Sequence, residues 1–186
     1  MGKILMISGK SASGKDAVAK IIQEELSNKK ILTIHFGDPV KWIARDYYNW
    51  NGEKNEQGRA LLQYIGTTLM RSYNPIYWAD IIAQYVAATR DQYDIVLIPD
   101  LRFKNEYNTV ANYNDNIILI RVERYNEDGS LYLNPLMTYE QSHHISECEL
   151  DNFAFHIIIE NSGTLKDLQA SVKTALHEIN KGEYNA

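Results

Sequence analysis

The sequence predicts an α/β fold in which helices cover both faces of a five-stranded parallel sheet. Five short apolar segments alternate with longer segments of helical periodicity, which is the pattern of repeated strand–helix units. Four of the five are nearly continuous runs of β-branched residues and leucine, as expected for strands buried on both faces. The first strand leads through a glycine-rich loop directly into a helix. These observations indicate one layered domain over residues 1–186.

The same two patterns place the individual elements along the chain. Strands are expected at residues 4–7, 30–36, 94–99, 116–122 and 155–160. Helices are expected at residues 14–28, 39–49, 57–72, 76–90, 104–113 and 165–180. Residues 37–92 contain three helices where one crossover would suffice, and residues 123–150 form a long polar insertion. Both insertions follow carboxyl ends of strands, where open α/β sheets bind ligands, so we expect an acceptor-binding region and a lid.

The loop after the first strand has the layout of a phosphate-binding loop. Its residues are Gly9, Lys10, Ser11, Ala12, Ser13, Gly14, Lys15 and Asp16. Glycines let backbone N–H groups curl around an anion, the helix N-terminus adds its positive dipole end, and Lys15 supplies a point charge. The flanking strand and helix favour this interpretation over an ordinary glycine-rich turn with a surface lysine.

The last residue of this loop departs from the usual pattern. It is commonly Ser or Thr, whose hydroxyl binds Mg²⁺, but here it is Asp16. A carboxylate would repel bare phosphate, whereas near a divalent ion it is a good oxygen ligand. We therefore expect Asp16 to contact Mg²⁺ directly or through water.

Composition excludes several classes of protein. The formal net charge of −5 argues against broad binding to nucleic acid or to a membrane surface. No apolar run approaches the roughly 20 residues of a membrane-spanning helix. The single cysteine, Cys148, excludes an internal disulfide and favours the reducing cytoplasm. We therefore expect a cytoplasmic protein that binds small molecules, and the sequence leaves open whether it forms a homodimer.

Charged side chains follow the third and fourth strands at the expected binding edge. Asp100 and Arg102 alternate at the end of the third strand, so both can point toward the loop. Asp100 could hold Mg²⁺ or its waters, and Arg102 could clamp a phosphate. Arg121 and Arg124 lead from the fourth strand toward the lid, where they could bracket a triphosphate. The simpler alternatives are a local ion pair between Asp100 and Arg102 and two solvated arginines.

The expected acceptor-binding region offers further candidates. Asp38 precedes Pro39 at the start of a helix, and Lys41 in the first turn is a candidate phosphate contact. Arg71, at the end of a later helix, is a similar candidate, and Trp78 is an aromatic side chain that could stack on a base. Each has a simpler alternative, because helix lysines and arginines are often solvated and helix aromatics often belong to the core.

Five strings in the sequence resemble those of the phage-type deoxynucleoside monophosphate kinases. They are Gly-Lys-Ser-Ala-Ser-Gly-Lys-Asp (9–16), Phe-Gly-Asp-Pro-Val-Lys (36–41), Leu-Gln-Tyr-Ile-Gly-Thr (62–67), Asp-Leu-Arg-Phe-Lys-Asn-Glu (100–106) and Ile-Glu-Asn-Ser-Gly-Thr-Leu-Lys-Asp-Leu (159–168). The resemblance covers about residues 4–172 in the same order, and Gly-Lys-Asp is frequent in that group. It implies a P-loop NTPase fold and an ATP-dependent kinase that phosphorylates a (deoxy)nucleoside monophosphate.

The resemblance also implies roles for individual residues. ATP phosphates would lie on residues 9–16 with Mg²⁺ nearby, the turn containing Asn161 and Gly163 would lie by the ATP base, and Arg124 would serve the lid. The acceptor nucleotide would contact the residues Asp38, Lys41, Arg71, Arg102 and Glu106. His144 and Glu147 match the family's His-x-Ser-Glu string and are also expected near the acceptor, although the family's usual acidic residue before that histidine is not obvious here.

Two other functions stay open at this level. Residues 146–153 and 159–161 are similar to animal phosphomevalonate kinases, which also use Gly-Lys-Asp, but the strings at 62–67 and 102–106 match the nucleotide kinases better. A nucleotide-binding module without transfer activity would keep the loop. Such a module would not need arginines on several separate elements, so their presence favours an enzyme.

Overall fold

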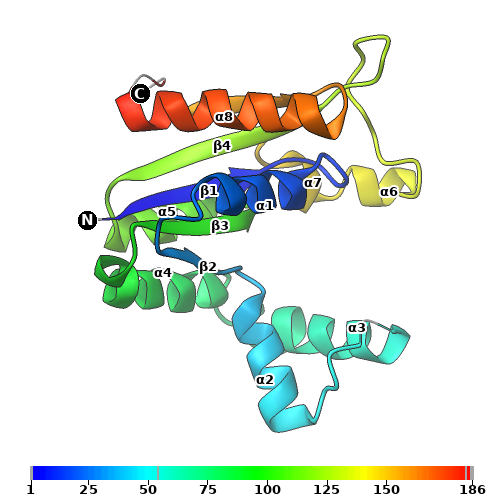
Figure 1. Cartoon of the computed structure of the whole chain (residues 1–186). Helices are drawn as coiled ribbons and strands as arrows, with labels where there is room; N and C mark the ends of the chain where they lie inside the picture. Colours follow the sequence, from blue (N-terminus) through cyan, green and yellow to red (C-terminus); the bar gives the residue numbers. More distant parts are fainter. Residues whose placement is uncertain (1, 54, 183, 185–186) are drawn as a thin grey trace.

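A computed structural model of the chain describes residues 2–53, 55–182 and 184. Its centre is a sheet of five strands, which are β1 (Lys3–Ser8), β2 (Ile31–Thr33), β3 (Ile95–Leu101), β4 (Ile117–Arg124) and β5 (Ile157–Asn161). Their order is β2-β3-β1-β4-β5, and every neighbouring pair is parallel (Figure 1). The predicted five-stranded parallel sheet is therefore confirmed.

Four helices cover the two faces of this sheet, as the apolar strands predict (Figure 1). They are α1 (Lys15–Glu25), α4 (Tyr77–Thr89), α5 (Lys104–Tyr113) and α8 (Leu165–Lys181). One face packs on α1 and α8, whose apolar residues form one core cluster with those of the strands. The opposite face packs on α4 and α5 and forms a second cluster. Three layers result, with the sheet in the middle.

Strand β2 is shorter than the expected segment 30–36. It lies at the edge of the sheet and pairs only with β3 over Ile31–Thr33. From His35 the chain turns into the next helix, where the N–H of Asp38 donates to the carbonyl oxygen of His35 at 3.0 Å. The strand ends early because this turn and the following helix use the backbone that would have extended it.

The insertion between β2 and β3 builds a smaller helical unit beside the sheet (Figure 1). It contains α2 (Asp38–Tyr48), α3 (Glu56–Gln63) and the π-helix η1 (Tyr64–Arg71), and η2 (Arg90–Gln92) is a single 3-10 turn after α4. The one helix expected at 57–72 is thus an α-helix that continues as a π-helix. A third apolar cluster, which includes Val40, Ala44, Ile65 and Trp78, joins this unit to α4.

The segment between β4 and β5 runs over the carboxyl edge of the sheet. It contains two short helices, α6 (Tyr139–Ser142) and α7 (Ile145–Cys148). Helix α6 begins at a capping box, in which the Thr138 hydroxyl accepts from the N–H of Gln141 at 3.2 Å and the Gln141 side chain accepts from the N–H of Thr138 at 3.0 Å. Among the described residues, no helix has the length and apolarity needed to cross a membrane.

Candidate active site

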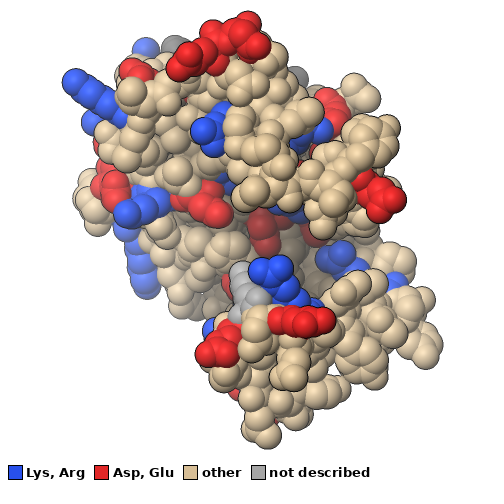
Figure 2. All heavy atoms as spheres, turned by 90° about the vertical axis from the view of Figure 1, so that its right-hand side faces the viewer, with Lys and Arg blue, Asp and Glu red and all other residues tan. Residues whose placement is uncertain are grey.

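The strand ends bring the candidate residues to one edge of the sheet. Because all strands are parallel, the residues that follow β1, β3, β4 and β5 emerge on the same side. Ser8 is in register with Leu101 of β3 and with Arg121 of β4, and Arg124 is in register with Asn161 of β5. Figure 2 looks onto this edge and shows a hollow, walled by basic and acidic side chains, between the sheet and the helical unit.

The glycine-rich loop after β1 presents the donors that an anion needs. The Lys15 ammonium group is buried and donates to the carbonyl oxygens of Gly9 at 2.7 Å and Lys10 at 2.8 Å. The first N–H groups of α1 have no partner within the helix. The Ser13 hydroxyl is buried and finds no hydrogen-bond partner in the described part of the chain. The loop can therefore hold phosphate oxygens by backbone amides, a hydroxyl and one ammonium group.

The charge on Lys15 is held in an unfavourable environment. Burial and the nearby Arg102 guanidinium lower the pKa of Lys15 to about 8. Both effects disfavour the positive charge of Lys15. A bound phosphate would offset them, because its negative charge stabilises the ammonium group. Such a lysine is suited to a polyanionic ligand.

The last residue of β5, Asn161, contacts the backbone of the loop. The Asn161 side-chain amide donates to the carbonyl oxygen of Ser13 at 2.9 Å. Gly14 has a φ of 103°, and a Cβ atom built there would lie 2.6 Å from that amide nitrogen. Glycine suits this position because of its positive φ and the close approach of Asn161, whose contact with the loop was not predicted from the sequence.

A carboxylate on α7 links Arg102 to the phosphate loop. Glu147 on α7 accepts from the backbone N–H of Ser11 at 2.7 Å and pairs with Arg102, whose Nη1 lies 2.5 Å from Oε1. The predicted alternative, a local ion pair between Asp100 and Arg102, is not among the ion pairs of the described residues. Glu147, Arg102 and the loop thus form one charged cluster.

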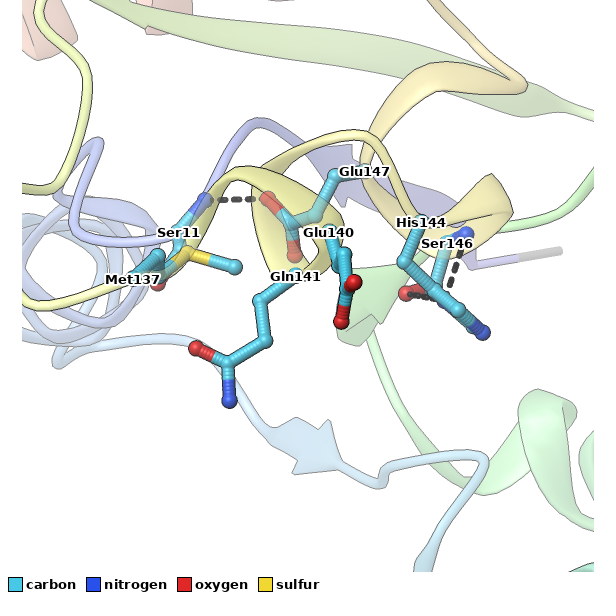
Figure 3. A pocket seen from close by; sticks show the side chains of 7 residues that line it. All are labelled: Ser11, Met137, Glu140, Gln141, His144, Ser146 and Glu147. Carbon is cyan, nitrogen blue, oxygen red and sulfur yellow. Dashed lines mark hydrogen bonds between the residues drawn. The ribbon is translucent and has the colours of Figure 1, made fainter.

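A cavity of about 530 Å³ opens beside this cluster (Figure 3). It is lined by Ser11, Met137, Glu140, Gln141, His144, Ser146 and Glu147. Figure 3 shows the side chains of Glu140 and Gln141 on the same side of α6, pointing away from the loop. His144 and Glu147, both expected near the acceptor, therefore share one cavity with the phosphate loop.

A buried acid lies behind Arg102. One oxygen of Glu106 accepts from the backbone N–H groups of Arg102 at 2.8 Å and Phe103 at 3.1 Å, while the other lies 3.7 Å from Nη2 of Arg71. Burial, with Asp100 nearby, raises the pKa of Glu106 to about 7. The Nε atom of Arg71 is buried and has no hydrogen-bond partner among the described residues, so Arg71 keeps a donor for a further anion.

Asp100 faces the turn between β2 and α2. Its carboxylate accepts from the N–H of Phe36 at 3.1 Å, and burial raises its pKa. In the same turn Asp38 accepts from the N–H of His35 at 2.8 Å and pairs with Lys41 at 2.8 Å. Lys41 is therefore held by Asp38 in the first turn of α2.

Two predicted site residues have different positions from those expected. Arg121 is buried beneath the loop, where it pairs with Asp151 at 2.9 Å and donates to the Ser8 hydroxyl at 3.3 Å. Trp78 is 1% exposed and donates from its ring nitrogen to the carbonyl oxygen of Gly66 at 2.8 Å. Neither side chain is free to contact a nucleotide, so the expectations for both are corrected to structural roles.

A second cavity, of about 450 Å³, lies by the ends of β4 and β5. Its lining includes Arg124, Tyr132, Asn161 and Gly163. The Arg124 guanidinium lies 4.1 Å from the centre of the Tyr132 ring and donates to the carbonyl oxygen of Ala12 at 3.3 Å. The three residues predicted for the ATP side therefore come together, and Tyr132 adds a flat apolar surface that the sequence did not single out.

Sequence reasoning also missed two polar residues that hold the loop. Asp151 pairs with Lys10 at 2.7 Å, and the Asn134 amide donates to the Ser11 hydroxyl at 3.1 Å. Asp151 lies in the string at 146–153 that resembles phosphomevalonate kinases, which was a usable signal. Asn134 carries no such signal, because it is one of many asparagines in a polar segment.

The oxygen ligands near the loop fit a magnesium ion that is also bound by a nucleotide. Asp16 is an exposed carboxylate in the first turn of α1, directly after Lys15. No group of three or more His, Cys, Asp or Glu side chains in the described residues is arranged to hold a metal by itself. Mg²⁺ in phosphate sites commonly takes one or two carboxylates together with waters and phosphate oxygens, which Asp16 can satisfy.

Solved structures with the same architecture are P-loop kinases. Dephospho-CoA kinase from Campylobacter jejuni aligns with a TM-score of 0.53 and 12% identity over 96% of this chain and 97% of that one. APS kinase CysC from Mycobacterium tuberculosis, in complex with AMPPNP and APS, gives 0.51 and 13% over 95% and 98%. A gluconokinase from Sinorhizobium meliloti 1021 gives 0.51 and 13% over 97% and 94%. At these identities the likeness establishes the P-loop kinase fold, as predicted.

Sequence comparison identifies the family. No match was found among curated proteins. Residues 48–172 match the family described as deoxynucleotide monophosphate kinase, and this range contains the strings at 62–67, 100–106 and 159–168, whereas the strings at 9–16 and 36–41 precede it. The match spans more than half of the chain, and the remaining part supplies the phosphate loop that such a kinase requires. The chain therefore belongs to the deoxynucleotide monophosphate kinase family.

Proposed function

We propose that the chain transfers the γ-phosphoryl group of ATP to a deoxynucleoside monophosphate and releases ADP and the deoxynucleoside diphosphate. The observation that carries this proposal is the position of two cavities on two sides of one phosphate loop. One is lined by Arg124, Asn161 and Gly163, and the other by Ser11 and Glu147. A donor nucleotide and an acceptor nucleotide could then meet at Lys15 and Arg102.

The proposed transfer is direct and in line. An oxygen of the acceptor phosphate forms a bond to the γ-phosphorus while the bond from that phosphorus to the β–γ bridging oxygen breaks, and ADP leaves. The phosphate monoester is already a nucleophile at neutral pH, so no general base is needed. Lys15, Arg102 and Arg124 would neutralise the charge on the transferring group, which is the main catalytic demand of phosphoryl transfer.

Mg²⁺ would neutralise charge on the β- and γ-phosphates when bound. Asp16 is the residue of the chain best placed to contact it, directly or through water. Asp100 is a weaker candidate, because its carboxylate accepts from Phe36 and faces the turn after β2. Its closeness to Asp38 and Glu106 supports a place for it on the acceptor side instead.

The acceptor would extend from the cavity lined by Ser11 and His144 into the hollow between the sheet and the helical unit. Arg71 offers a buried Nε donor that lacks a partner in the described residues, Lys41 lies at the turn after β2, and Arg102 lies at the loop. These three cations stand on η1, α2 and the end of β3. A phosphate monoester that bridges them would be positioned for attack, and His144 lines the neighbouring cavity.

The test is ADP formation from ATP and Mg²⁺ with a panel of acceptors. The panel contains each deoxynucleoside monophosphate, each ribonucleoside monophosphate and phosphomevalonate, and Lys15→Ala serves as the inactive control. Formation of a deoxynucleoside diphosphate is the expected result and names the accepted base. Turnover of phosphomevalonate alone would replace the proposed acceptor, and ATP binding without turnover of any acceptor would indicate a nucleotide-binding module.

A further inference from the structure

We propose that Glu147 is a positioning residue that fixes the Arg102 guanidinium beside the phosphate loop. Both carboxylate oxygens of Glu147 are engaged by Ser11 and Arg102, so in this role Glu147 acts on the reaction through the arginine although its side chain lines the cavity beside the loop. The inference rests on the proposed kinase function, because Arg102 is the group that would meet the transferring phosphoryl. It assigns Glu147 a different part from the acceptor contact expected from the sequence.

The contacts of Glu147 place one carboxylate between two parts of the site. Its Oε2 accepts from the N–H of Ser11 in the loop, and its Oε1 pairs with Nη1 of Arg102. The Glu147 side chain is 9% exposed and that of Arg102 is 28% exposed. The carboxylate is therefore shielded from water on both contacts, which is the condition in which a charged hydrogen bond holds its geometry well.

The local charges explain why such an anion is needed. Besides burial, Arg102 and Arg121 each lower the pKa of Lys15, while Glu147 and Asp16 raise it, so three cations and two counter-charges act on one another at the loop, and only Glu147 of these two anions pairs with Arg102. Without Glu147, repulsion from Lys15 would favour rotation of the longer arginine side chain toward solvent. The carboxylate keeps Arg102 at the loop against this repulsion.

Glu147 occupies one amide of the loop and leaves the donors at the start of α1 unoccupied. It takes the N–H of Ser11, which lies early in the loop, and not the N–H groups at the start of α1. Those later amides, with the Ser13 hydroxyl and Lys15, are the groups that can hold the phosphates of ATP. A carboxylate in this place is compatible with bound ATP, which favours positioning over competition with the nucleotide.

The segment around Glu147 is built to present this side chain. The N–H of Ser146 donates to Nδ1 of His144 at 3.2 Å, so His144 caps α7 and Glu147 follows three residues later. Lys10 donates to the backbone carbonyl oxygen of Glu147 at 3.1 Å and pairs with Asp151. The His-x-Ser-Glu string can thus be understood as a helix start that delivers one carboxylate to the loop.

The kinetic test compares Glu147→Gln with Glu149→Gln. Glu149 is the matched control, because it lies next to α7 and accepts from the N–H of Lys104 at 2.8 Å without touching the loop. We expect Glu147→Gln to lower kcat about tenfold to a hundredfold while KM for ATP changes less than about threefold. Glu149→Gln should retain wild-type values.

A double variant separates positioning from an independent effect. If Glu147 acts through Arg102, Arg102→Lys and Glu147→Gln/Arg102→Lys should lose the same amount of kcat. If the kcat losses of the two single variants instead multiply in the double variant, the proposal is wrong. A Glu147→Gln variant with unchanged kcat and a lower KM for ATP would also overturn it, because the carboxylate would then be a competitor of phosphate.

A second measurement does not depend on turnover. The ¹⁵N side-chain NMR signals of Arg102, assigned by their loss in Arg102→Lys, should show slow rotation of the guanidinium in the wild-type chain. Glu147→Gln should remove this restriction and Glu149→Gln should preserve it. If the chain phosphorylates no acceptor, the proposed function fails, and this NMR comparison alone decides whether Glu147 holds Arg102. Unchanged Arg102 signals in Glu147→Gln would refute the positioning role.

Discussion

Lys15 donates to the carbonyl oxygen of Gly9, six residues earlier, at a distance of 2.7 Å. A second bond to the carbonyl oxygen of Lys10, at 2.8 Å, completes the anchoring of the ammonium group inside the loop that precedes its own helix. The lysine is therefore already folded over the loop and needs no large rearrangement to meet a phosphate. The glycine-rich loop pattern thus places the ammonium group of Lys15 where a phosphate would bind.

Replacement of Lys15 by alanine should reduce turnover far more than it destabilises the chain. The ammonium group supplies charge to the transferring phosphoryl, so kcat should fall about a hundredfold to a thousandfold. The folded state loses two hydrogen bonds but also a buried cation that lies near Arg102, and these effects oppose each other. The measurements are steady-state turnover and thermal unfolding of both proteins. Normal turnover, or loss of the folded state, would contradict the assigned role.

Replacement of Glu106 by glutamine should change how stability depends on pH. Burial raises the pKa of Glu106 from 4.5 to about 7. At Glu106 the folded chain therefore binds more protons than the unfolded chain between these values, so the contribution of Glu106 to the free energy of unfolding falls as the pH rises from about 4.5 to about 7. Glutamine imitates the protonated acid, and its single carbonyl oxygen can accept from Arg102 and Phe103 as Glu106 does.

The stability of the two proteins should therefore diverge with pH. At about 1.4 kcal/mol per pKa unit, Glu106→Gln should gain of the order of 3 kcal/mol relative to wild type between pH 4 and pH 8. Urea unfolding at both pH values measures this difference, with the exposed Glu140→Gln as a control. A constant difference across the range would mean that Glu106 is not a buried acid of raised pKa.

Loss of the Arg124 side chain should weaken the binding of ATP and leave the binding of the acceptor unchanged. Arg124 lies over Tyr132 beside the cavity that includes Asn161 and Gly163. Arg124→Ala should raise KM for ATP about tenfold, the scale of one desolvated cation–π or phosphate contact, with KM for the acceptor nearly unchanged. Lys20→Ala, a lysine on the exposed face of α1, is the control. A rise confined to the acceptor KM would place Arg124 on the other side of the loop.

The Trp78→Phe variant tests the corrected role of this tryptophan. The smaller phenylalanine ring has no N–H group, so it would leave the carbonyl oxygen of Gly66 without its donor and would open a small cavity in the third core cluster. The free energy of unfolding should fall by about 1 to 3 kcal/mol, while the preference among acceptors stays the same below the melting temperature. Changed acceptor preference at wild-type stability would return Trp78 to the binding site.

The sequence was informative where one local pattern determines one structure. The apolar strands, the glycine loop and Lys15 need only their neighbours in the chain to be interpreted, and the sheet edge then brings Arg102 and Asn161 to the loop. It was ambiguous for Arg121 and Trp78, because a buried and a functional side chain have the same periodicity. Only tertiary contacts reveal that Asp151 pairs with Arg121 and that Gly66 accepts from Trp78.

The segment between β4 and β5 was the least predictable part of the site. The sequence indicated a polar insertion at 123–150, but short helices such as α6 and α7 are too brief for a periodic signal. The contact between Glu147 and the N–H of Ser11 joins residues separated by 136 positions. No local pattern encodes that distance, so the string containing His144 could suggest a site but not the carboxylate's partner.

Transfer of label from [γ-³²P]ATP to each deoxynucleoside monophosphate is the measurement that tests the central claim most directly. We expect a labelled deoxynucleoside diphosphate whose formation requires Mg²⁺ and is lost in Lys15→Ala. Label that stays in ATP with every deoxynucleotide, or that moves only to phosphomevalonate, would contradict it.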